Sequence, residues 1–366
     1  MRCVLSGMDK DAAGSVVAAG SRRDRGVAWI EGRHPPVNAL SQPVRQGLVD
    51  GVRALACDLS VDAIVLSAAG STFFAGADID ELDRGVAAPG LLDLVRACDG
   101  APQPVVAALH GTVYGGGVVV AYACDRRVAE EGTRFALPEV GLGLLPTFGG
   151  TQWLPRWLGV EPALALILDG QTWTAELALA HGLVDALAPA QGLDDAVHAA
   201  ALAGPAKRRI GDPAQWCETP PELRAEAIQR RRDRLACSAP DFDAAWTCLE
   251  VIERGLELPI EEALRLEHEQ FERLRQSAQS RRLRRLFFAE RRLRRCGSAV
   301  EPAAQRVRET GDDPAALVAL ARRILADGDI ADAELLDALI VRVLGLPRHA
   351  PSRIGTLLPE RSFAPV

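Results

Sequence analysis

The sequence predicts an α/β fold followed by an all-helical C-terminal region. Two observations carry this prediction. Between Arg25 and about Pro189, short apolar runs rich in β-branched residues alternate with segments of helical spacing, as in a sheet whose strands are joined by helices. From Leu193 to about Arg295 the sequence changes to long, arginine-rich amphipathic segments with almost no strand signal.

Composition and charge narrow the class of protein. The 366 residues, 48% hydrophobic and 25% charged, suffice for one large or two modest domains with a full core. A net charge of −7 argues against a nucleic-acid partner, which needs a basic field. Apolar stretches are interrupted well before the roughly 20 residues of a membrane span, and residues 1–21 lack the pattern of a secretory signal. We expect a cytoplasmic protein without a membrane partner.

The elements follow one another in a βαβ-like order. A first strand is expected at Val27–Glu31, a helix at Pro43–Ala56, and further buried strands at Ala63–Ser67 and Val105–Leu109. In the helical region, Glu261–Arg275 and Ser280–Arg295 have helical spacing. In the second of these, Leu283, Leu286, Phe287 and Leu293 recur between arginines, which favours an apolar stripe under a solvated face over a nucleic-acid site.

Three parts are expected along the chain: a core over residues 22–192, a helical region over 193–296, and a last part over 297–366. Gly297–Asp313, rich in small, polar and proline residues, resembles a linker. Pro314 then opens a final helical unit, and the tail after Pro347 is expected to be loop.

The cysteines and histidines predict no metal site. They are dispersed, without a CxxC pair, so we expect buried reduced thiols instead of disulfides or zinc. His110 and His349 fall at a strand end and in a loop, and we do not expect either to be catalytic. The cysteines are Cys3, Cys57, Cys98, Cys124, Cys217, Cys237, Cys248 and Cys296.

Two glycine-rich passages follow buried strands, at Ser67–Leu82 and His110–Asp125. Gly115–Gly117 precede an apolar helical segment, so free N–H donors of a helix N-terminus are expected there. Glycine triplets also serve simply as tight turns, so the triplet alone does not decide between a turn and an anion-binding helix N-terminus. Neither passage carries the GxxxxGK[ST] or GxGxxG pattern, which disfavours a nucleotide- or NAD-driven enzyme.

A third passage, Arg134–Gly159, contains Glu139 directly after a proline and ahead of an apolar, glycine-broken stretch. A carboxylate enclosed there loses solvation, which raises its pKa toward the range in which it can take and return a proton near pH 7. Glu139 is therefore the candidate general base.

Together, FAGADI, the glycine triplet before a helix, PEVGLGLLP and GGTQ resemble the crotonase (enoyl-CoA hydratase/isomerase) superfamily in order and spacing, from about Val27 to Pro189. The resemblance implies a spiral of ββα turns and an acyl-CoA thioester as substrate, with coenzyme A as part of that substrate and no other cofactor. It implies that the backbone N–H groups of Ala77 and Gly116 bind the thioester oxygen and that Glu139 moves the proton. Asp78 is expected to organise its own loop more than to catalyse. The substrate-contacting positions implied are Asn38, Ala39, Leu40, Ala75, Asp78, Gly115, Gly117, Val119 and Thr147.

Two positions depart from the family's pattern. Hydratases carry a first glutamate where this chain has Val119, so hydration by a pair of glutamates is in doubt. Thr147 stands where hydrolases place an aspartate, which disfavours hydrolysis. Isomerisation of an enoyl-CoA by the single Glu139, or hydration by it alone, remains open, and a non-catalytic acyl-CoA-binding or assembly subunit is the alternative.

The C-terminal part resembles the multifunctional β-oxidation enzyme. Ala278–Arg295 is similar to its linker helix, and Leu335–Ala350 to the C-terminal motif of its dehydrogenase half. The NAD-binding domain that lies between them in the family is missing here, so the resemblance implies no dehydrogenase activity. It implies a trimer, or a monomer if the linker helix covers the oligomer surface.

Overall fold

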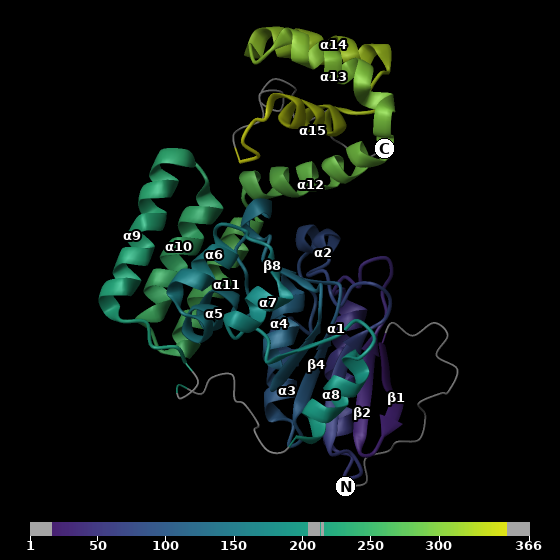
Figure 1. Cartoon of the computed structure of the whole chain (residues 1–366). Coiled ribbons are helices and arrows are strands. Elements are labelled where there is room, and N and C mark those ends of the chain that lie inside the picture. Colours follow the sequence, from purple (N-terminus) through teal and green to yellow (C-terminus); the bar gives the residue numbers. More distant parts are fainter. Residues whose placement is uncertain (1–16, 204–212, 214–215, 350–366) are drawn as a thin grey trace. The chain divides into compact units, whose positions relative to one another are not determined.

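The structure is a computed structural model of the chain (Figure 1), and the residues described are 17–203, 213 and 216–349. Among these residues the chain forms two compact units. The first, here called the sheet unit, contains described residues within 17–140, 145–231 and 247–271. The second, here called the helical unit, contains 141–144, 232–246 and 272–349. The three-part division at residues 192 and 296 is not tested by these bounds and stays a prediction.

A six-stranded sheet forms the centre of the sheet unit, in the order β1-β2-β3-β4-β6-β9. β1 and β2 pair antiparallel, and every other neighbouring pair is parallel. The strands are β1 Val17–Asp24, β2 Val27–Gly32, β3 Ala63–Ala68, β4 Val105–Leu109, β6 Arg126–Glu130 and β9 Ala186–Ala188.

The central strands are buried along their whole length because both faces of the sheet are covered. Every residue of β3 and of β4 is buried, which is typical of parallel strands between two layers. On one face, α8 (Leu193–Leu202) inserts Val197 and Ala201 among strand side chains that include Val65 and Val106. α1 (Gln42–Ala56) packs against β1 and β2. The predicted strands and the predicted helix at 43–56 are confirmed to within one residue.

A second, three-stranded sheet lies in the same unit, in the order β5-β7-β8, with β5 and β7 parallel and β7 and β8 antiparallel. Short helices follow its strands and those of the first sheet. These elements are β5 Thr112–Tyr114, β7 Arg134–Ala136, β8 Trp173–Thr174, α2 Ile79–Arg84, α3 Leu91–Gly100, α4 Gly116–Ala123, η1 Val140–Leu142, α5 Gly150–Leu158, α6 Val160–Ile167 and α7 Ala175–Ala180.

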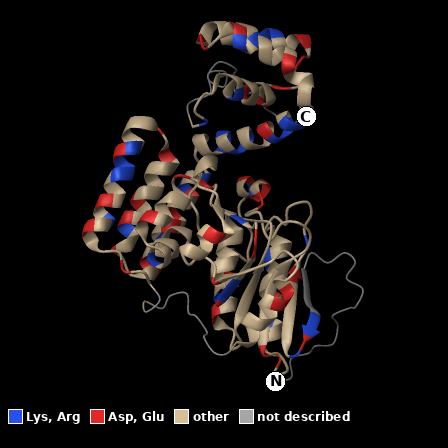
Figure 2. Cartoon of the chain, in the orientation of Figure 1, with Lys and Arg blue, Asp and Glu red and all other residues tan. Residues whose placement is uncertain are grey.

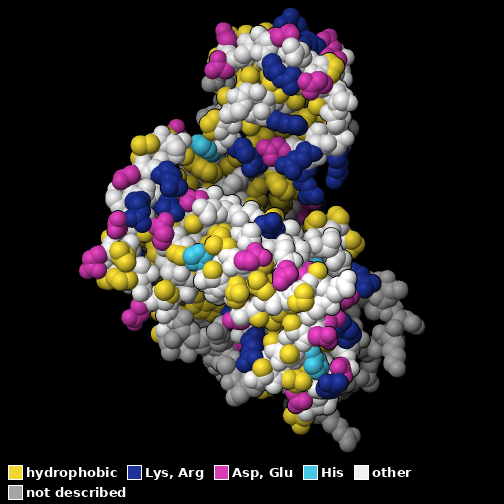
Figure 3. All heavy atoms as spheres, in the orientation of Figure 1, with side chains coloured by type: hydrophobic (Ala, Val, Ile, Leu, Met, Phe, Trp, Pro, Cys, Tyr) yellow, Lys and Arg dark blue, Asp and Glu magenta, His cyan; other side chains and the backbone are white. Residues whose placement is uncertain are grey.

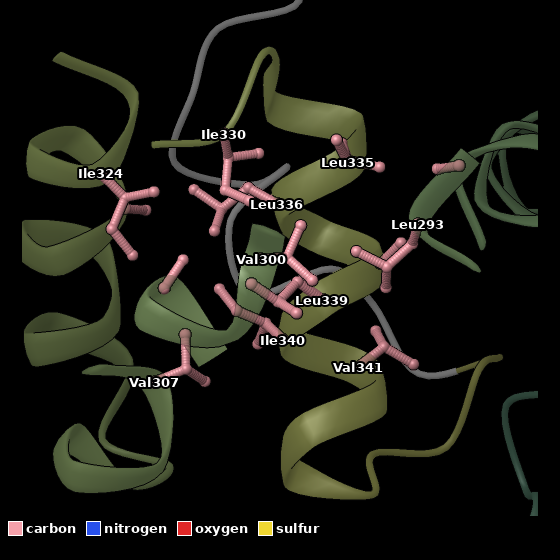
Figure 4. Packing of buried hydrophobic residues seen from close by; sticks show 14 of the residues in the cluster. Leu293, Val300, Val307, Ile324, Ile330, Leu335, Leu336, Leu339, Ile340 and Val341 are labelled. Atoms are coloured by element: carbon pink, nitrogen blue, oxygen red, sulfur yellow. The ribbon is translucent and has the colours of Figure 1, made fainter. Parts of the chain in front are cut away.

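The rest of the described chain is helical, as predicted. The elements are α9 Pro221–Ser238, α10 Asp243–Leu256, α11 Ile260–Arg275, α12 Ala278–Cys296, η3 Gly297–Val300, α13 Glu301–Thr310, α14 Pro314–Asp327 and α15 Ala333–Leu344. Asp313 and Asp332 cap α14 and α15 by accepting hydrogen bonds from backbone N–H groups of the first turn. Figure 4 shows side chains of α12 to α15, among them Leu293 and Leu336, meeting in one core.

The predicted linker at Gly297–Asp313 is wrong over most of its length, because η3 and α13 occupy residues 297–310. Ala303, Ala304 and Val307 are buried at helical spacing in the core of the helical unit. Their small side chains, and Pro302 in the first turn where a proline is tolerated, give a composition that resembles a linker. Packing against α14 and α15 makes the segment a helix.

The arginine-rich α12 has the predicted apolar stripe, with Leu283, Leu286 and Leu293 buried and Phe287 partly buried. Most of its arginines are exposed or half-buried, but Arg284 is buried. Figure 2 shows the basic residues along this helix in blue. Basic and acidic side chains lie interspersed on the visible face of the helical unit (Figure 3), and Arg292 pairs with Asp332. This face is not a continuous basic field.

The described cysteines are free, as expected, but the expectation that they are buried is only partly correct. Cys98, Cys124 and Cys248 are buried, whereas Cys57, Cys217 and Cys237 are exposed, and Cys3 lies outside the described residues. Helices of the described ranges are each too short or too polar to cross a membrane. The described residues also contain no group of three or more His, Cys, Asp or Glu placed to hold a metal ion.

Candidate active site

The loop after β3 is tied to two neighbouring segments. Leu40 N–H donates to the carbonyl of Gly76 at 2.9 Å, and Leu40 and Ala77 form an isolated parallel bridge. On the other side, Tyr114 N–H donates to the carbonyl of Phe74 at 3.1 Å. Asp78 caps α2 by accepting from Asp80 N–H at 3.0 Å. Asp78 thus organises its own loop, as predicted.

The glycine triplet forms the start of α4. Gly115 has φ 53° and ψ −121°, a conformation open mainly to glycine, and its N–H donates to the carbonyl of Ala136 at 2.8 Å. Gly117 lies so close to the preceding loop that an added Cβ would stand 2.1 Å from the carbonyl oxygen of Phe74. The triplet therefore does more than turn the chain, because it allows the two loops to approach each other.

The N–H groups of Ala77 and Gly116 lie in this same small region. The nitrogen of Gly116 is 3.6 Å from where a Cβ on Gly76 would stand, and the nitrogen of Ala77 is 3.7 Å from where a Cβ on Gly116 would stand. Within the described part of the chain, neither N–H has a hydrogen-bond acceptor. Gly116 is also the first residue of α4, where the helix dipole adds positive potential.

Glu139 lies next to these donors. Its Oε1 is 2.6 Å from where a Cβ on Gly115 would stand. Its Oε2 is buried, and no hydrogen-bond partner for it exists among the described residues. Burial raises the pKa of Glu139 from its ordinary 4.5 to about 7. A carboxyl group with this pKa can accept and release a proton near neutral pH.

The surroundings of these groups are largely apolar. Val119, on α4, is buried. The Cδ1 atoms of Leu91 and Leu40 lie 2.8 and 3.1 Å from where a Cβ on Gly116 would stand. Ala75 is half-buried, whereas Ala77 is exposed. The Val119 side chain can neither exchange a proton nor form a hydrogen bond with a water.

The segment Asn38–Leu40 is fixed from within the protein. The buried Asn38 side chain accepts from His34 N–H at 2.7 Å and donates to the carbonyls of Ala69 and Thr72, each at 2.7 Å. Leu40 is fully buried and Ala39 half-buried. The Asn38 carboxamide is therefore committed to internal hydrogen bonds, and the backbone of this segment is what it can offer to a ligand.

One functional candidate was missed by the sequence analysis, the buried Glu267 of α11. It accepts hydrogen bonds from Gly149 N–H at 2.7 Å, from Thr151 N–H at 2.9 Å and from the Thr151 hydroxyl at 2.6 Å. The Thr147 hydroxyl also bonds to it. Burial raises the pKa of Glu267 to about 7, and these hydrogen bonds oppose the shift.

A signal for Glu267 does exist in the sequence. Together with Ala263 and Phe271 it forms an i, i+4, i+8 row, and all three residues are buried. An acidic residue in the middle of an apolar helical row marks a carboxylate with buried partners.

Of the histidines, His110 and His349 were considered as catalytic candidates, and they lie in different units of the structure. His110 Nε2 is 3.1 Å from the carbonyl oxygen of Gly70 in the sheet unit. His349, in the helical unit, stacks on Phe242 with ring centroids 4.8 Å apart, and burial lowers the pKa of its imidazole. That neither is catalytic stays a prediction.

Comparison with known proteins places these residues in a family context. Residues 22–205 match the family described as enoyl-CoA hydratase/isomerase. The chain is 34% identical over 281 residues to the peroxisomal bifunctional enzyme of Homo sapiens, covering 74% of this chain and 38% of that protein. It is 38% identical over 168 residues to a probable enoyl-CoA hydratase of Bacillus subtilis (strain 168), covering 44% of this chain and 65% of that protein.

A solved structure is similar as well. The crystal structure of an enoyl-CoA hydratase from Mycobacterium avium subsp. paratuberculosis K-10 matches with a TM-score of 0.53 and 26% identity, covering 74% of this chain and 98% of that one. The chain spans less than half the length of the bifunctional relative that it matches.

Proposed function

The chain belongs to the enoyl-CoA hydratase/isomerase family, and on that premise we propose that it acts on acyl-CoA thioesters, moving the double bond of an enoyl chain by proton transfer through Glu139. The observation that carries this proposal is the neighbourhood of one enclosed carboxylate and two backbone N–H groups that have no acceptor among the described residues, with a valine at position 119.

The two N–H groups supply the electrostatic part of the mechanism. Removing a proton beside a thioester turns its carbonyl into an enolate oxygen with developing negative charge. Fixed donors from Ala77 and Gly116 would stabilise that charge without reorganising, and one such donor is typically worth about 3–4 kcal/mol. We propose that Gly115 and Gly117 let the thioester lie against the backbone at this point.

Glu139 supplies the proton transfer. Starting from a 3-enoyl-CoA, its carboxylate takes a proton from C2, and the electrons move into a dienolate. The resulting carboxyl group returns the proton to C4, which leaves the double bond between C2 and C3. No water takes part, and atoms and charge balance with one acid alone. A pKa of about 7 suits a group that must both take and give the proton.

Hydration by Glu139 alone is the second candidate reaction. Val119 weighs against it, because a single carboxylate would have to orient the water that a pair of glutamates otherwise holds between them. Both reactions use the same substrate class, and neither needs a cofactor besides the coenzyme A of the substrate.

The remaining positions are assigned as substrate contacts. We propose that the backbone of Asn38–Leu40 borders the coenzyme A moiety and that Ala75 and Asp78 belong to the loop over the thioester. Val119 and Thr147 border the acyl side of the site. The trimeric or monomeric state, the cytoplasmic location and the lack of dehydrogenase activity stay predictions.

Mass spectrometry of the products tests the proposed reaction. Purified enzyme is incubated with 3-enoyl-CoA and 2-enoyl-CoA thioesters of several chain lengths. Isomerisation keeps the mass, so the thioesters are separated by liquid chromatography before mass analysis and the 2-enoyl product is identified by its retention time against a standard, whereas hydration adds one water. We expect the isomer. Tight calorimetric binding of coenzyme A esters without any product would instead identify a non-catalytic acyl-CoA-binding or assembly subunit.

A substitution at position 119 tests whether the residue there selects isomerisation over hydration. Val119→Glu restores the second carboxylate, so the share of hydrated product should rise, while Val119→Gln, of similar size but without an acid, should leave it unchanged. Equal product ratios in wild type and both variants would show that this position does not select the reaction.

A further inference from the structure

The Glu267 carboxylate accepts the hydrogen bonds that one turn of the sheet unit donates. Its two carboxylate oxygens accept from the N–H groups of Gly149 and Thr151 and from the Thr151 hydroxyl, at 2.6–2.9 Å. Gly149 has a left-handed conformation and is the N-cap of α5. The carboxylate therefore replaces the side-chain cap that this helix lacks, and it fixes the turn formed by residues 147–151.

The turn is joined to α4 by a hydrogen bond from a buried tyrosine. The hydroxyl of Tyr122, in α4, donates to the carbonyl of Phe148 at 3.1 Å. Tyr122 is 1% exposed, and its ring lies edge-on against Trp153 of α5, with centroids 5.7 Å apart. The helix that begins at Gly116 is thus attached, at its other end, to the turn that Glu267 holds.

A second set of contacts reaches Gly116 from the opposite direction. Phe148 Cε1 is 3.2 Å from where a Cβ on Gly90 would stand, at the N-cap of α3. The next residue, Leu91, places its Cδ1 2.8 Å from where a Cβ on Gly116 would stand. Displacement of the turn would therefore act on Gly116 both through α4 and through the start of α3.

We propose that Glu267 is a positioning residue of the active site: by holding the 147–151 turn it fixes Gly116, and with it the N–H that faces the thioester oxygen. This inference rests on the proposed function. In this role Glu267 positions the backbone of the site and takes no part in the proton transfer, which Glu139 performs.

A carboxylate is needed at this place because it accepts only. Glu267→Gln keeps the shape but has one acceptor oxygen, so its NH2 group would face one of the donors in the turn. The turn must then shift to relieve this contact. Displacements of about 1 Å in a catalytic geometry cost on the order of 100-fold in rate.

Steady-state kinetics compare Glu267→Gln with Glu269→Gln, the matched control, whose exposed side chain lies on the same helix. Rates are expressed per folded molecule, with the folded fraction measured by circular dichroism. We expect kcat to fall roughly 10- to 100-fold in Glu267→Gln with KM changed less than about threefold, because the lost interaction acts in the transition state.

Two milder variants keep the test usable if Glu267→Gln folds poorly. Thr151→Val removes the hydroxyl donor, and Tyr122→Phe removes the hydrogen bond to Phe148. Each should lower kcat less than Glu267→Gln does. In the double variant of Tyr122→Phe and Glu267→Gln the losses should be smaller than the product of the single ones, because both act through the same turn.

A second readout does not depend on turnover. In protein labelled with 15N-glycine, the amide resonance of Gly116, assigned by its absence in Gly116→Ala, should shift in Glu267→Gln and stay in place in Glu269→Gln. Failure of the proposed function would show as an inactive wild type. Failure of this inference would show as equal kcat in the two Gln variants, or as an unmoved Gly116 resonance.

Discussion

Gly115→Ala places a methyl group between the backbone of the site and its carboxylate. The added Cβ would stand 2.6 Å from Glu139 Oε1, whereas ordinary contact begins at 3.4 Å, so the carboxylate has to move by about 0.8 Å. A displacement of this size predicts a loss of roughly 10- to 100-fold in kcat. The positive φ of Gly115 adds strain of about 1–3 kcal/mol to the folded state.

Gly132→Ala is the matched control for this substitution. Gly132 also has a positive φ, of 88°, but nothing lies within 4 Å of an added Cβ. Both variants carry the strain of a positive φ and should lower the free energy of unfolding in urea denaturation, while only Gly115→Ala loses turnover of enoyl-CoA. Full activity in Gly115→Ala would refute the placement of Glu139 at this glycine.

Three further predictions follow from the described contacts. Because burial raises the pKa of Glu139 to about 7, its carboxyl stays protonated to higher pH than usual, and kcat/KM should rise with pH to a half-maximum near 7. A half-maximum near 4.5 would contradict the raised pKa of Glu139. Asn38→Ala removes the three hydrogen bonds of a buried side chain and should lower the free energy of unfolding by about 2–4 kcal/mol in denaturant titrations; a loss under 1 kcal/mol would contradict the assigned contacts. Gly143→Ala would bring a Cβ to 2.7 Å from Ser280 Cα at a φ of 71°, and should cost about 2–5 kcal/mol. Gly328→Ala, strained but without neighbours within 4 Å, should cost less, and equal losses would refute the close approach.

The sequence predicts those features that are encoded locally. Strands such as Val105–Leu109 are continuous apolar runs, and the glycine triplet, the FAGADI passage and Glu139 lie in short motifs with fixed spacing. For these the crotonase resemblance is confirmed by the family match over residues 22–205. The N–H groups of Ala77 and Gly116 and the Glu139 carboxylate each lie in a motif that comes directly after a strand. Their placement in loops is therefore predictable from the sequence.

Other features depend on partners distant in sequence. α13 consists of small and polar residues that become helical by packing on α14 and α15, which composition does not reveal. Glu267 lies 116 residues from Thr151, and its hydrogen bonds to the 147–151 turn form only when α11 packs against the start of α5. Arg284 departs in the same way from the solvated face expected of α12, since it is buried and donates to the Ser280 hydroxyl.

The rate of Glu139→Gln on 3-enoyl-CoA, measured beside the affinity of the same variant for a coenzyme A ester, tests the central claim most directly. The substitution keeps the size of the side chain and removes its ability to take a proton. The account predicts a fall in kcat of roughly two to four orders of magnitude with binding retained. A variant that turns over substrate at the wild-type rate would contradict it.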